Sequence, residues 1–251
     1  MSTTPLVAAA GLAKTYEGAG GGAIEALAGI DLEVSAGEFV SVVGPSGCGK
    51  STLLGILSGA IAPTAGSVTV HGRPAHMPQR DLLMPWRTAA RNAAVALEAS
   101  GVDRAEAELA ARKQLADFGL DRFADAWPNE LSGGMRQRVA LARTMLAATD
   151  LLLLDEPFGA LDALTRLELQ SSLSATCRER GLTTVLVTHD LEEAVALADT
   201  VYVLSPRPGQ IVARVAVDLG KDRDPSQRLS DEFGRCRAEL MQAIGVSGGT
   251  A

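Results

Sequence analysis

The sequence has little of what several classes of protein require. Its 251 residues include three widely separated cysteines, Cys48, Cys177 and Cys236. This spacing forms neither a zinc motif nor a disulfide framework, and it favours a reducing compartment. No cationic segment precedes an apolar one near the N-terminus, so we expect no secretory signal peptide. No apolar run approaches the ~20 residues that cross a bilayer, so we expect any membrane association to go through a partner protein.

Basic charge is also scarce. Lys and Arg total 23 against 30 Asp and Glu, which gives a net charge of −7 and a pI near 5.1. A global basic surface for nucleic acid is therefore excluded, and we expect no nucleic-acid partner. The composition is 47% hydrophobic, enough for one substantial core or one domain with a subdomain. One of only four lysines, Lys50, stands in the most informative motif.

A glycine-rich turn follows the apolar stretch 38–43 and matches the pattern G-x-x-x-x-G-K-[ST]. It consists of Gly44, Pro45, Ser46, Gly47, Cys48, Gly49, Lys50, Ser51 and Thr52, called the phosphate loop below. Its glycines let backbone N–H groups turn towards an anion, and the helix expected over 50–57 points its positive end there. Lys50 can reach the outer phosphates of a nucleotide, and the Ser51 hydroxyl can ligate Mg²⁺. The strand, the loop and the helix occur in the order that the motif requires, so a chance glycine-rich turn is disfavoured. Cys48 is interpreted as a small loop filler, with a reactive thiol as the alternative.

A second motif is the run LLLLDEP at 151–157. A strand that ends in two acids places carboxylates at the carboxyl edge of the sheet, where the phosphate loop also lies. Asp155 can hold Mg²⁺ directly or through water. Glu156 can act as a general base or position the water that attacks a γ-phosphate. Without the phosphate loop, Asp155 and Glu156 could equally be polar residues that simply end a strand.

A third motif, LSGGMRQR at 131–138, opens a predicted helix. Ser132 is a plausible N-cap, and Gly133 and Gly134 leave the backbone accessible, so this signature segment predicts a second anion site. A nucleotide held by the phosphate loop needs no second receptor in the same chain. The simplest explanation is that the signature segment receives the nucleotide of another copy.

The order of elements predicts an α/β fold. Short strands are expected at 6–9, 24–27 and 30–34, a strand followed by a turn at 66–75, and a helical region at 86–127. Helices at 132–147, 162–179 and 191–198 then alternate with apolar strands at 150–154, 183–187 and 200–204. We therefore predict a phosphate-loop NTPase core with a mostly parallel sheet, an N-terminal antiparallel β subdomain and an inserted α-helical subdomain. The domain would span 1–220, with the helical subdomain at about 80–131, and 221–251 would be a short tail with a helix at 230–244.

Taken together, these motifs resemble the ATP-binding subunits of ABC transporters. The phosphate loop, 131–137, 151–157, 160–162 and 188–190 occur in the order of that family, over roughly residues 6–220. The resemblance implies that two copies pair head to tail and sandwich two ATP molecules. Each ATP would lie between one phosphate loop and the Ser132, Gly133 and Gly134 of the other copy.

The resemblance also implies individual roles. Asp162 would cross the dimer interface, and His189 would contact the γ-phosphate and help hold the attacking water. Gln79 would touch Mg²⁺ and water and link the site to a transmembrane permease, and Tyr16 would stack on adenine. For His189 the alternative is a satisfied structural histidine, and for Tyr16 it is packing within a small sheet.

Six other residues are interpreted without a catalytic role. Trp86 and Trp127 are interpreted as anchors of the helical subdomain, and the resemblance places Trp86 near a groove for a permease helix. His71 and His76 are interpreted as surface or turn residues. Arginines 136 and 138 fit either an interface or a solvated helix face.

Three functions are weighed. The first is the ATP-hydrolysing subunit of an importer, bound to a permease at the cytoplasmic face of the membrane and served indirectly by an extracytoplasmic solute-binding protein. The second is a soluble ABC ATPase of translation or DNA repair, but the chain has one ATPase half and no long coiled-coil insertion. The third is a phosphate-loop kinase or GTPase, which needs no signature segment.

Residues 77–86 and 204–211 resemble the nitrate, sulfonate and taurine branch of importers, which includes uptake of thiamine-pyrimidine precursors.

Overall fold

The core of the molecule is a six-stranded sheet in the order β5-β6-β7-β3-β8-β9. The computed structural model describes residues 4–18, 21–220 and 225–246. Neighbouring strands are parallel except that the edge strand β9 runs antiparallel to β8. The strands are β3 (Phe39–Val43), β5 (Pro74–Met77), β6 (Leu151–Asp155), β7 (Thr183–Thr188), β8 (Thr200–Leu204) and β9 (Ile211–Ala216). The predicted α/β class with a mostly parallel sheet is confirmed, although β9 was not predicted.

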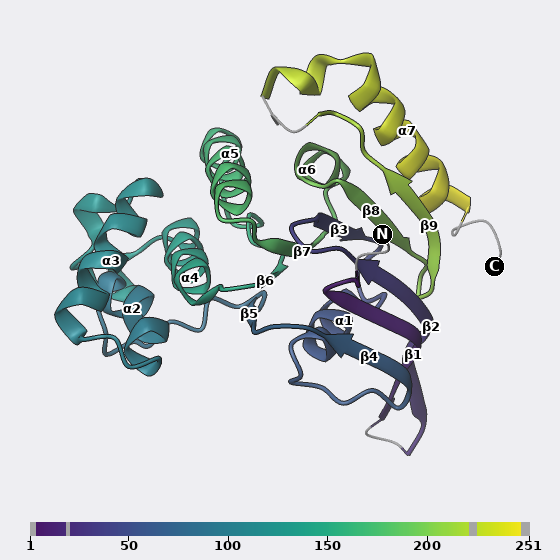
Figure 1. Cartoon of the computed structure of the whole chain (residues 1–251), viewed down its shortest axis with the longest axis horizontal. Coiled ribbons are helices and arrows are strands. Elements are labelled where there is room, and N and C mark those ends of the chain that lie inside the picture. The colour runs from purple at the N-terminus through teal and green to yellow at the C-terminus, as the bar shows by residue number, and fades with distance from the viewer. Residues whose placement is uncertain (1–3, 19–20, 221–224, 247–251) are drawn as a thin grey trace.

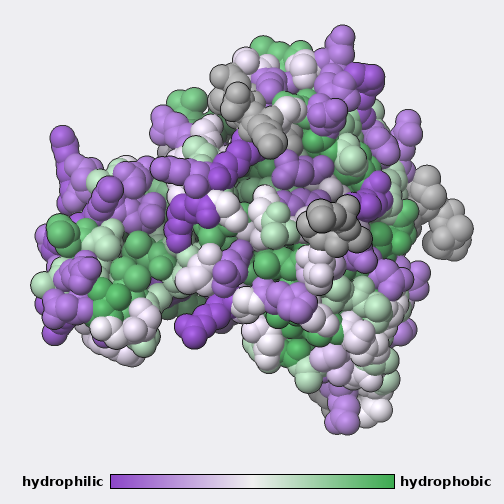
Figure 2. All heavy atoms as spheres, viewed as in Figure 1, coloured by the Kyte–Doolittle hydropathy of each residue, from purple (hydrophilic) through white to green (hydrophobic). Residues whose placement is uncertain are grey.

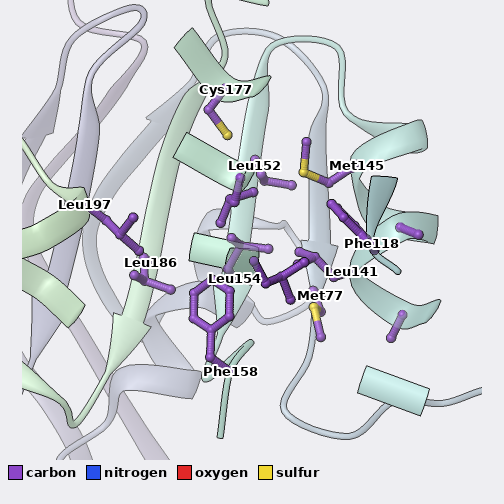
Figure 3. Packing of buried hydrophobic residues seen from close by; sticks show 14 of the residues in the cluster. Met77, Phe118, Leu141, Met145, Leu152, Leu154, Phe158, Cys177, Leu186 and Leu197 are labelled. Atoms are coloured by element: carbon purple, nitrogen blue, oxygen red, sulfur yellow. The ribbon is translucent and has the colours of Figure 1, made fainter. Parts of the chain in front are cut away.

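Helices cover both faces of this sheet (Figure 1). They are α1 (Lys50–Leu57), α4 (Gly133–Ala147), α5 (Ala163–Glu179), α6 (Leu191–Leu197) and α7 (Asp231–Val246). Alternate residues of β6 enter two separate hydrophobic clusters, one on each face. On one face Leu152 and Leu154 meet Leu141 and Met145 of α4 (Figure 3). Because β6 is buried on both sides, its sequence is a continuous apolar run rather than an alternating one.

A smaller antiparallel sheet, in the order β2-β1-β4, lies beside α1. Its strands are β1 (Val7–Glu17), β2 (Ala23–Val34) and β4 (Ala65–Val70). The prediction of two strands at 24–27 and 30–34 is wrong, because β2 continues through Gly29, whose positive φ of 68° absorbs an irregularity in the pairing with β1. The strand and turn expected at 66–75 are present, and β5 begins directly after the turn. Gly72, with φ 102°, turns the chain from β4 into β5 of the other sheet.

The inserted helices form a lobe apart from the sheets, on the left of Figure 1. It contains α2 (Ala89–Ala99), α3 (Arg104–Asp117) and the short 3-10 helices η1 (Asp121–Phe123) and η2 (Pro128–Glu130). Its core combines alanines, which let α2, α3 and α4 approach closely, with larger residues such as Leu115 and Phe118. Trp86 and Trp127 are 71% and 45% exposed, so the prediction that they anchor the lobe is wrong. Figure 2 shows hydrophilic residues gathered where the lobe joins the rest of the molecule.

The C-terminal helix α7 packs on α6 and on the edge strand β9. It follows the short 3-10 helix η3 (Pro225–Leu229), and it buries Phe233, Cys236 and Leu240. The helix predicted at 230–244 is therefore present and covers one end of the core. Among the described residues, none of the helices has the length and apolar character of a membrane span.

Candidate functional site

The phosphate loop joins β3 to α1 and has the glycine conformations that its pattern predicts. Gly47 and Gly49 have φ of 77° and 104°, a region that side-chain-bearing residues rarely adopt. A Cβ atom added at Gly49 would lie 2.7 Å from the carbonyl oxygen of Ala26, so this turn also needs glycine for close packing. Gly49 is the N-cap of α1, so the last three residues of the phosphate loop form the first turn of that helix. The first amides of α1 therefore face the turn, as an anion site requires.

Lys50 is held inside the phosphate loop. Its ammonium group donates to the carbonyl oxygens of Gly44 at 2.7 Å and Pro45 at 3.0 Å, and the residue is 6% exposed. The Cys48 sulfur lies 3.8 Å from the same nitrogen. Burial raises the pKa of the Cys48 thiol despite the nearby positive charge, so the thiol stays protonated at neutral pH. The interpretation of Cys48 as a small loop filler is favoured over a reactive thiol.

Asp155 ends β6 beside the phosphate loop. It is 4% exposed, and this burial raises the pKa of its carboxyl group. A hydrogen bond with Ser51 and the charge of Lys50 act in the opposite direction. The structure therefore brings together the carboxylate and the hydroxyl that were predicted to hold Mg²⁺.

Glu156 has an unusual backbone that several contacts hold in place. Its φ is 49°, which costs about 1–3 kcal/mol for a residue other than glycine. Its N–H donates to the carbonyl of Val187 at 2.9 Å. The Gln137 amide donates to the Glu156 carbonyl at 2.7 Å and accepts from the Ala160 N–H at 2.8 Å. Sequence reasoning missed Gln137. Its place one turn after the signature glycines is the only signal the sequence offered.

The Glu156 carboxylate lies between two other predicted site residues. The Gln79 amide donates to its Oε2 at 3.3 Å, and Nδ1 of His189 lies 3.2 Å from its Oε1. Gln79 follows β5, Glu156 follows β6 and His189 follows β7, so three adjacent strand ends supply the group. The structure thus places Gln79, Glu156 and His189 together at the carboxyl edge of the sheet, the edge predicted for the carboxylates of the 151–157 motif.

A cleft of about 380 Å³ extends from this group along the phosphate loop. Tyr16 lines it, with its ring 37% exposed and its hydroxyl donating to Thr52 Oγ1 at 3.4 Å. Tyr16 therefore belongs to the small sheet and also borders the cleft. The lining comprises Tyr16, Ile24, Ala26, Ser46, Gly47, Gly49, Lys50, Ser51, Thr52, Gln79, Glu156 and Arg207.

The signature segment lies outside this cleft. Ser132 caps α4 by accepting the Met135 N–H at 3.2 Å, as predicted. Asp162 caps α5 in the same way, and its hydrogen bonds with Thr165 lower the pKa of its carboxyl group. Neither Ser132, Gly133, Gly134 nor Asp162 lines the cleft that holds Lys50. A separate depression of about 590 Å³ contains Gly133 and reaches Glu156 and His189 from the side of the helical lobe.

Three further residues can be compared with their interpretation. His76 lies within β5 rather than in a turn, and burial lowers the pKa of its imidazole. Arg136 bonds Asp81 at 3.0 Å, and Arg138 donates to the Phe118 carbonyl at 3.0 Å. Both arginines thus have partners within the chain rather than a purely solvated role.

A buried carboxylate supports the His189 loop from behind. Glu193 of α6 is 5% exposed and accepts the Thr188 hydroxyl proton at 2.6 Å. The Thr188 oxygen in turn accepts the Asp190 N–H at 3.0 Å, which fixes the backbone on both sides of His189. Burial raises the pKa of Glu193 from its ordinary 4.5 to about 7, and nearby Asp190 adds to this effect. Arg166 acts in the opposite direction.

The raised pKa of Glu193 predicts a loss of stability as the pH rises. The folded state holds this proton more tightly than the unfolded chain, so the contribution is complete below pH 4.5 and is lost as the pH rises through 7. Glu193→Gln cannot ionise and should escape this loss. Between pH 5.5 and 8 we expect the wild type to lose about 2 kcal/mol of unfolding free energy relative to Glu193→Gln. Urea unfolding across this range, with exposed Glu192→Gln as the control, measures the difference; parallel curves for wild type and Glu193→Gln would contradict it.

Comparison with known proteins agrees with this geometry. The ABC transporter family model matches residues 27–159. The aliphatic sulfonates import ATP-binding protein SsuB of Corynebacterium glutamicum is 41% identical over 98% of this chain and 97% of its own length. The nitrate import ATP-binding protein NrtC of Synechococcus elongatus is 42% identical over 86% of this chain, which matches 34% of that longer protein.

A solved structure shows the same fold. It is a dimeric ATP-binding cassette in a post-hydrolysis state, bound to ADP and Pi, with 31% identity and a TM-score of 0.78. The match covers 84% of this chain and 98% of that one. The chain therefore belongs to the ABC transporter family and is one of its ATPase subunits.

Proposed function

We propose that the chain binds ATP and Mg²⁺ in the 380 Å³ cleft, hydrolyses the ATP in a head-to-tail dimer and thereby energises a membrane importer. The observation that carries this proposal is the position of the Glu156 carboxylate. It lies at the edge of the cleft that contains Lys50, between Gln79 and His189. A carboxylate in this position can accept a proton from a water molecule that lies beside a phosphate in the same cleft.

The nucleotide would occupy the cleft along its length. The Lys50 ammonium donates to carbonyl oxygens of its own loop in this structure. It would move to the β- and γ-phosphates, because their negative charge attracts it more strongly than neutral carbonyls do. The amides of the phosphate loop and the start of α1 would surround the same oxygens. The half-exposed ring of Tyr16 would pack against adenine.

The donors present fit Mg²⁺. Ser51 and Asp155 are joined by a hydrogen bond, and Gln79 adds an amide oxygen near Glu156. Among the described residues no cluster of three or more His, Cys, Asp or Glu is found, which agrees with an ion that takes most of its oxygens from phosphates and water. When bound, Mg²⁺ would neutralise charge that develops on the phosphates.

Glu156 would act as the general base. Its Oε1 or Oε2 would accept the proton of the water that attacks the γ-phosphate. Gln79 and His189, which contact these two oxygens, would hold the carboxylate and the water in line. The contacts of Gln137 with the Glu156 backbone would keep the carboxylate at this place.

A second copy would complete the site. Ser132, Gly133 and Gly134 lie at the start of α4, away from their own chain's cleft, so they are available to a γ-phosphate held by a partner. The dimeric solved neighbour, which contains ADP and Pi, supports this arrangement. Asp162, at the start of α5, would lie at the same interface.

The relatives support import as the process. Their names specify sulfonate and nitrate import, so we propose a solute of the nitrate, sulfonate, taurine or thiamine-pyrimidine class. The chain would bind a transmembrane permease at the cytoplasmic face of the membrane, and an extracytoplasmic protein would deliver the solute. The alternative is an ABC ATPase that is not coupled to transport.

Capture of partners from native membranes tests the proposal. Tagged Glu156→Gln is expected to hold its complex together with ATP and Mg²⁺, and mass spectrometry of the captured chains should find a multi-spanning permease. Lys50→Ala, which should not bind ATP, is the matched control for ATP-dependent capture. Recovery of ribosomal or DNA-associated proteins without a membrane protein would contradict the importer function but not the ATPase chemistry.

A further inference from the structure

The loop between β8 and β9 packs tightly on the nucleotide cleft. Gly209 donates its N–H to the Ala26 carbonyl at 3.0 Å, and its own carbonyl accepts the Ala28 N–H at 3.0 Å. A Cβ atom at Gly209 would lie 2.1 Å from the carbonyl oxygen of Cys48, so only glycine fits against the phosphate loop. The Ser205 hydroxyl braces the loop from inside by donating to the Pro208 carbonyl at 3.0 Å. The loop is therefore fixed to both β2 and the phosphate loop.

This loop places an arginine at the cleft. Nε of Arg207 donates to the carbonyl oxygen of Gly47 at 3.2 Å. Arg207 lines the 380 Å³ cleft, where Lys50 and Arg207 supply the positive charges and Glu156 the negative one. Within the described part of the chain, no carboxylate forms an ion pair with Arg207. The hydrogen bond to the Gly47 carbonyl uses only Nε. The two terminal nitrogens can therefore donate to a ligand in the cleft.

We infer that Arg207 is a further nucleotide-contacting residue that binds the phosphate chain of ATP. The Gly47 carbonyl fixes the guanidinium against the phosphate loop, which is the part of the cleft where the phosphates are expected. A planar guanidinium with two terminal donors matches phosphate oxygens. Lys50 and Arg207 would then approach the phosphates from the inner and outer sides of the loop, since Lys50 is buried and Arg207 is exposed.

The inference rests on the proposed ATP cleft, so binding by the wild type is measured first. The full chain is titrated with Mg²⁺ and the β,γ-imido analogue of ATP, at protein concentrations where light scattering finds monomers. Arg207→Ala and Arg207→Gln should each raise the Kd about tenfold, since each loses a charge-assisted contact. Arg207→Lys keeps the charge but loses the planar pair of terminal donors, so its Kd should lie between those of the wild type and Arg207→Ala. Arg214→Ala, at an exposed arginine on adjacent β9, is the matched control and should bind as the wild type does.

A second readout separates phosphate binding from support of the loop. Arg207→Gln keeps a donor for the Gly47 carbonyl but has no charge. If Arg207 only supports the loop, Arg207→Gln should bind the analogue as the wild type does, and this result would overturn the inference. If Arg207 contacts phosphate, added salt should weaken binding less steeply in both neutral variants than in the wild type. Equal salt dependence, or an Arg207→Ala variant that binds normally and only dimerises poorly, would also overturn it. Absence of binding by the wild type would instead overturn the ATP cleft itself.

Discussion

Glu156→Gln is expected to lower the rate of ATP hydrolysis at least about 100-fold while ATP still binds, because a positioned general base contributes about 10²–10⁴ to the rate. The amide of Gln cannot accept the proton of the attacking water. It has nearly the same shape as the carboxylate, and its one oxygen can still accept a hydrogen bond from Gln79 or from His189. The variant should therefore keep both ATP molecules and accumulate as a dimer. Phosphate release and light scattering in the presence of ATP and Mg²⁺ measure the two effects.

Glu192→Gln is the matched control for this result. Glu192 is an exposed residue of α6 that pairs with Arg237 at 2.8 Å and does not contact the cleft. The same chemical change there should leave hydrolysis within about twofold of the wild type, as expected for a surface ion pair. Near-normal hydrolysis in Glu156→Gln would remove Glu156 from the role of base, and the γ-phosphate or His189 would then have to accept the proton.

The sequence was most informative where local pattern and final structure obey the same rule. The phosphate loop needs glycine for its backbone angles, and the buried strand that ends at Asp155 needs an apolar run, so both were visible without coordinates. The N-cap Ser132 was visible for the same reason, since a cap acts on an amide only three residues away. Each of these features depends on neighbours in the chain.

Features set by distant neighbours escaped prediction. The sequence did not reveal that Gln137 holds the Glu156 backbone, because the contact joins α4 to the end of β6. Trp86 has the size of a core residue, yet it is 71% exposed, and other residues form the core of the helical lobe. The place of Arg207 beside Gly47 depends on how the β8–β9 loop packs against the phosphate loop, 160 residues away in the chain. Such contacts follow from tertiary packing, which single-residue patterns do not encode.

Ser132→Asp is expected to lower ATP hydrolysis about 100-fold or more, a loss typical of a misplaced charge where transition-state charge is stabilised. Asp caps helices as well as Ser does, so α4 should keep its first turn. The added carboxylate would repel the γ-phosphate that the partner copy holds. Ser132→Asn is the matched control, because it also caps the helix and has similar size but no charge. It should hydrolyse ATP within about tenfold of the wild type.

Mixing two inactive variants tests whether each site uses two chains. Lys50→Ala has an impaired phosphate loop and an intact signature segment, whereas Ser132→Asp has the reverse. In a head-to-tail dimer of one copy of each, both defects fall in one site and the other site is intact. A 1:1 mixture should therefore recover about a quarter of wild-type hydrolysis, since half of the dimers are mixed and one site of each works. If both parts of a site came from one chain, every site in the mixture would carry a defect and no activity would return.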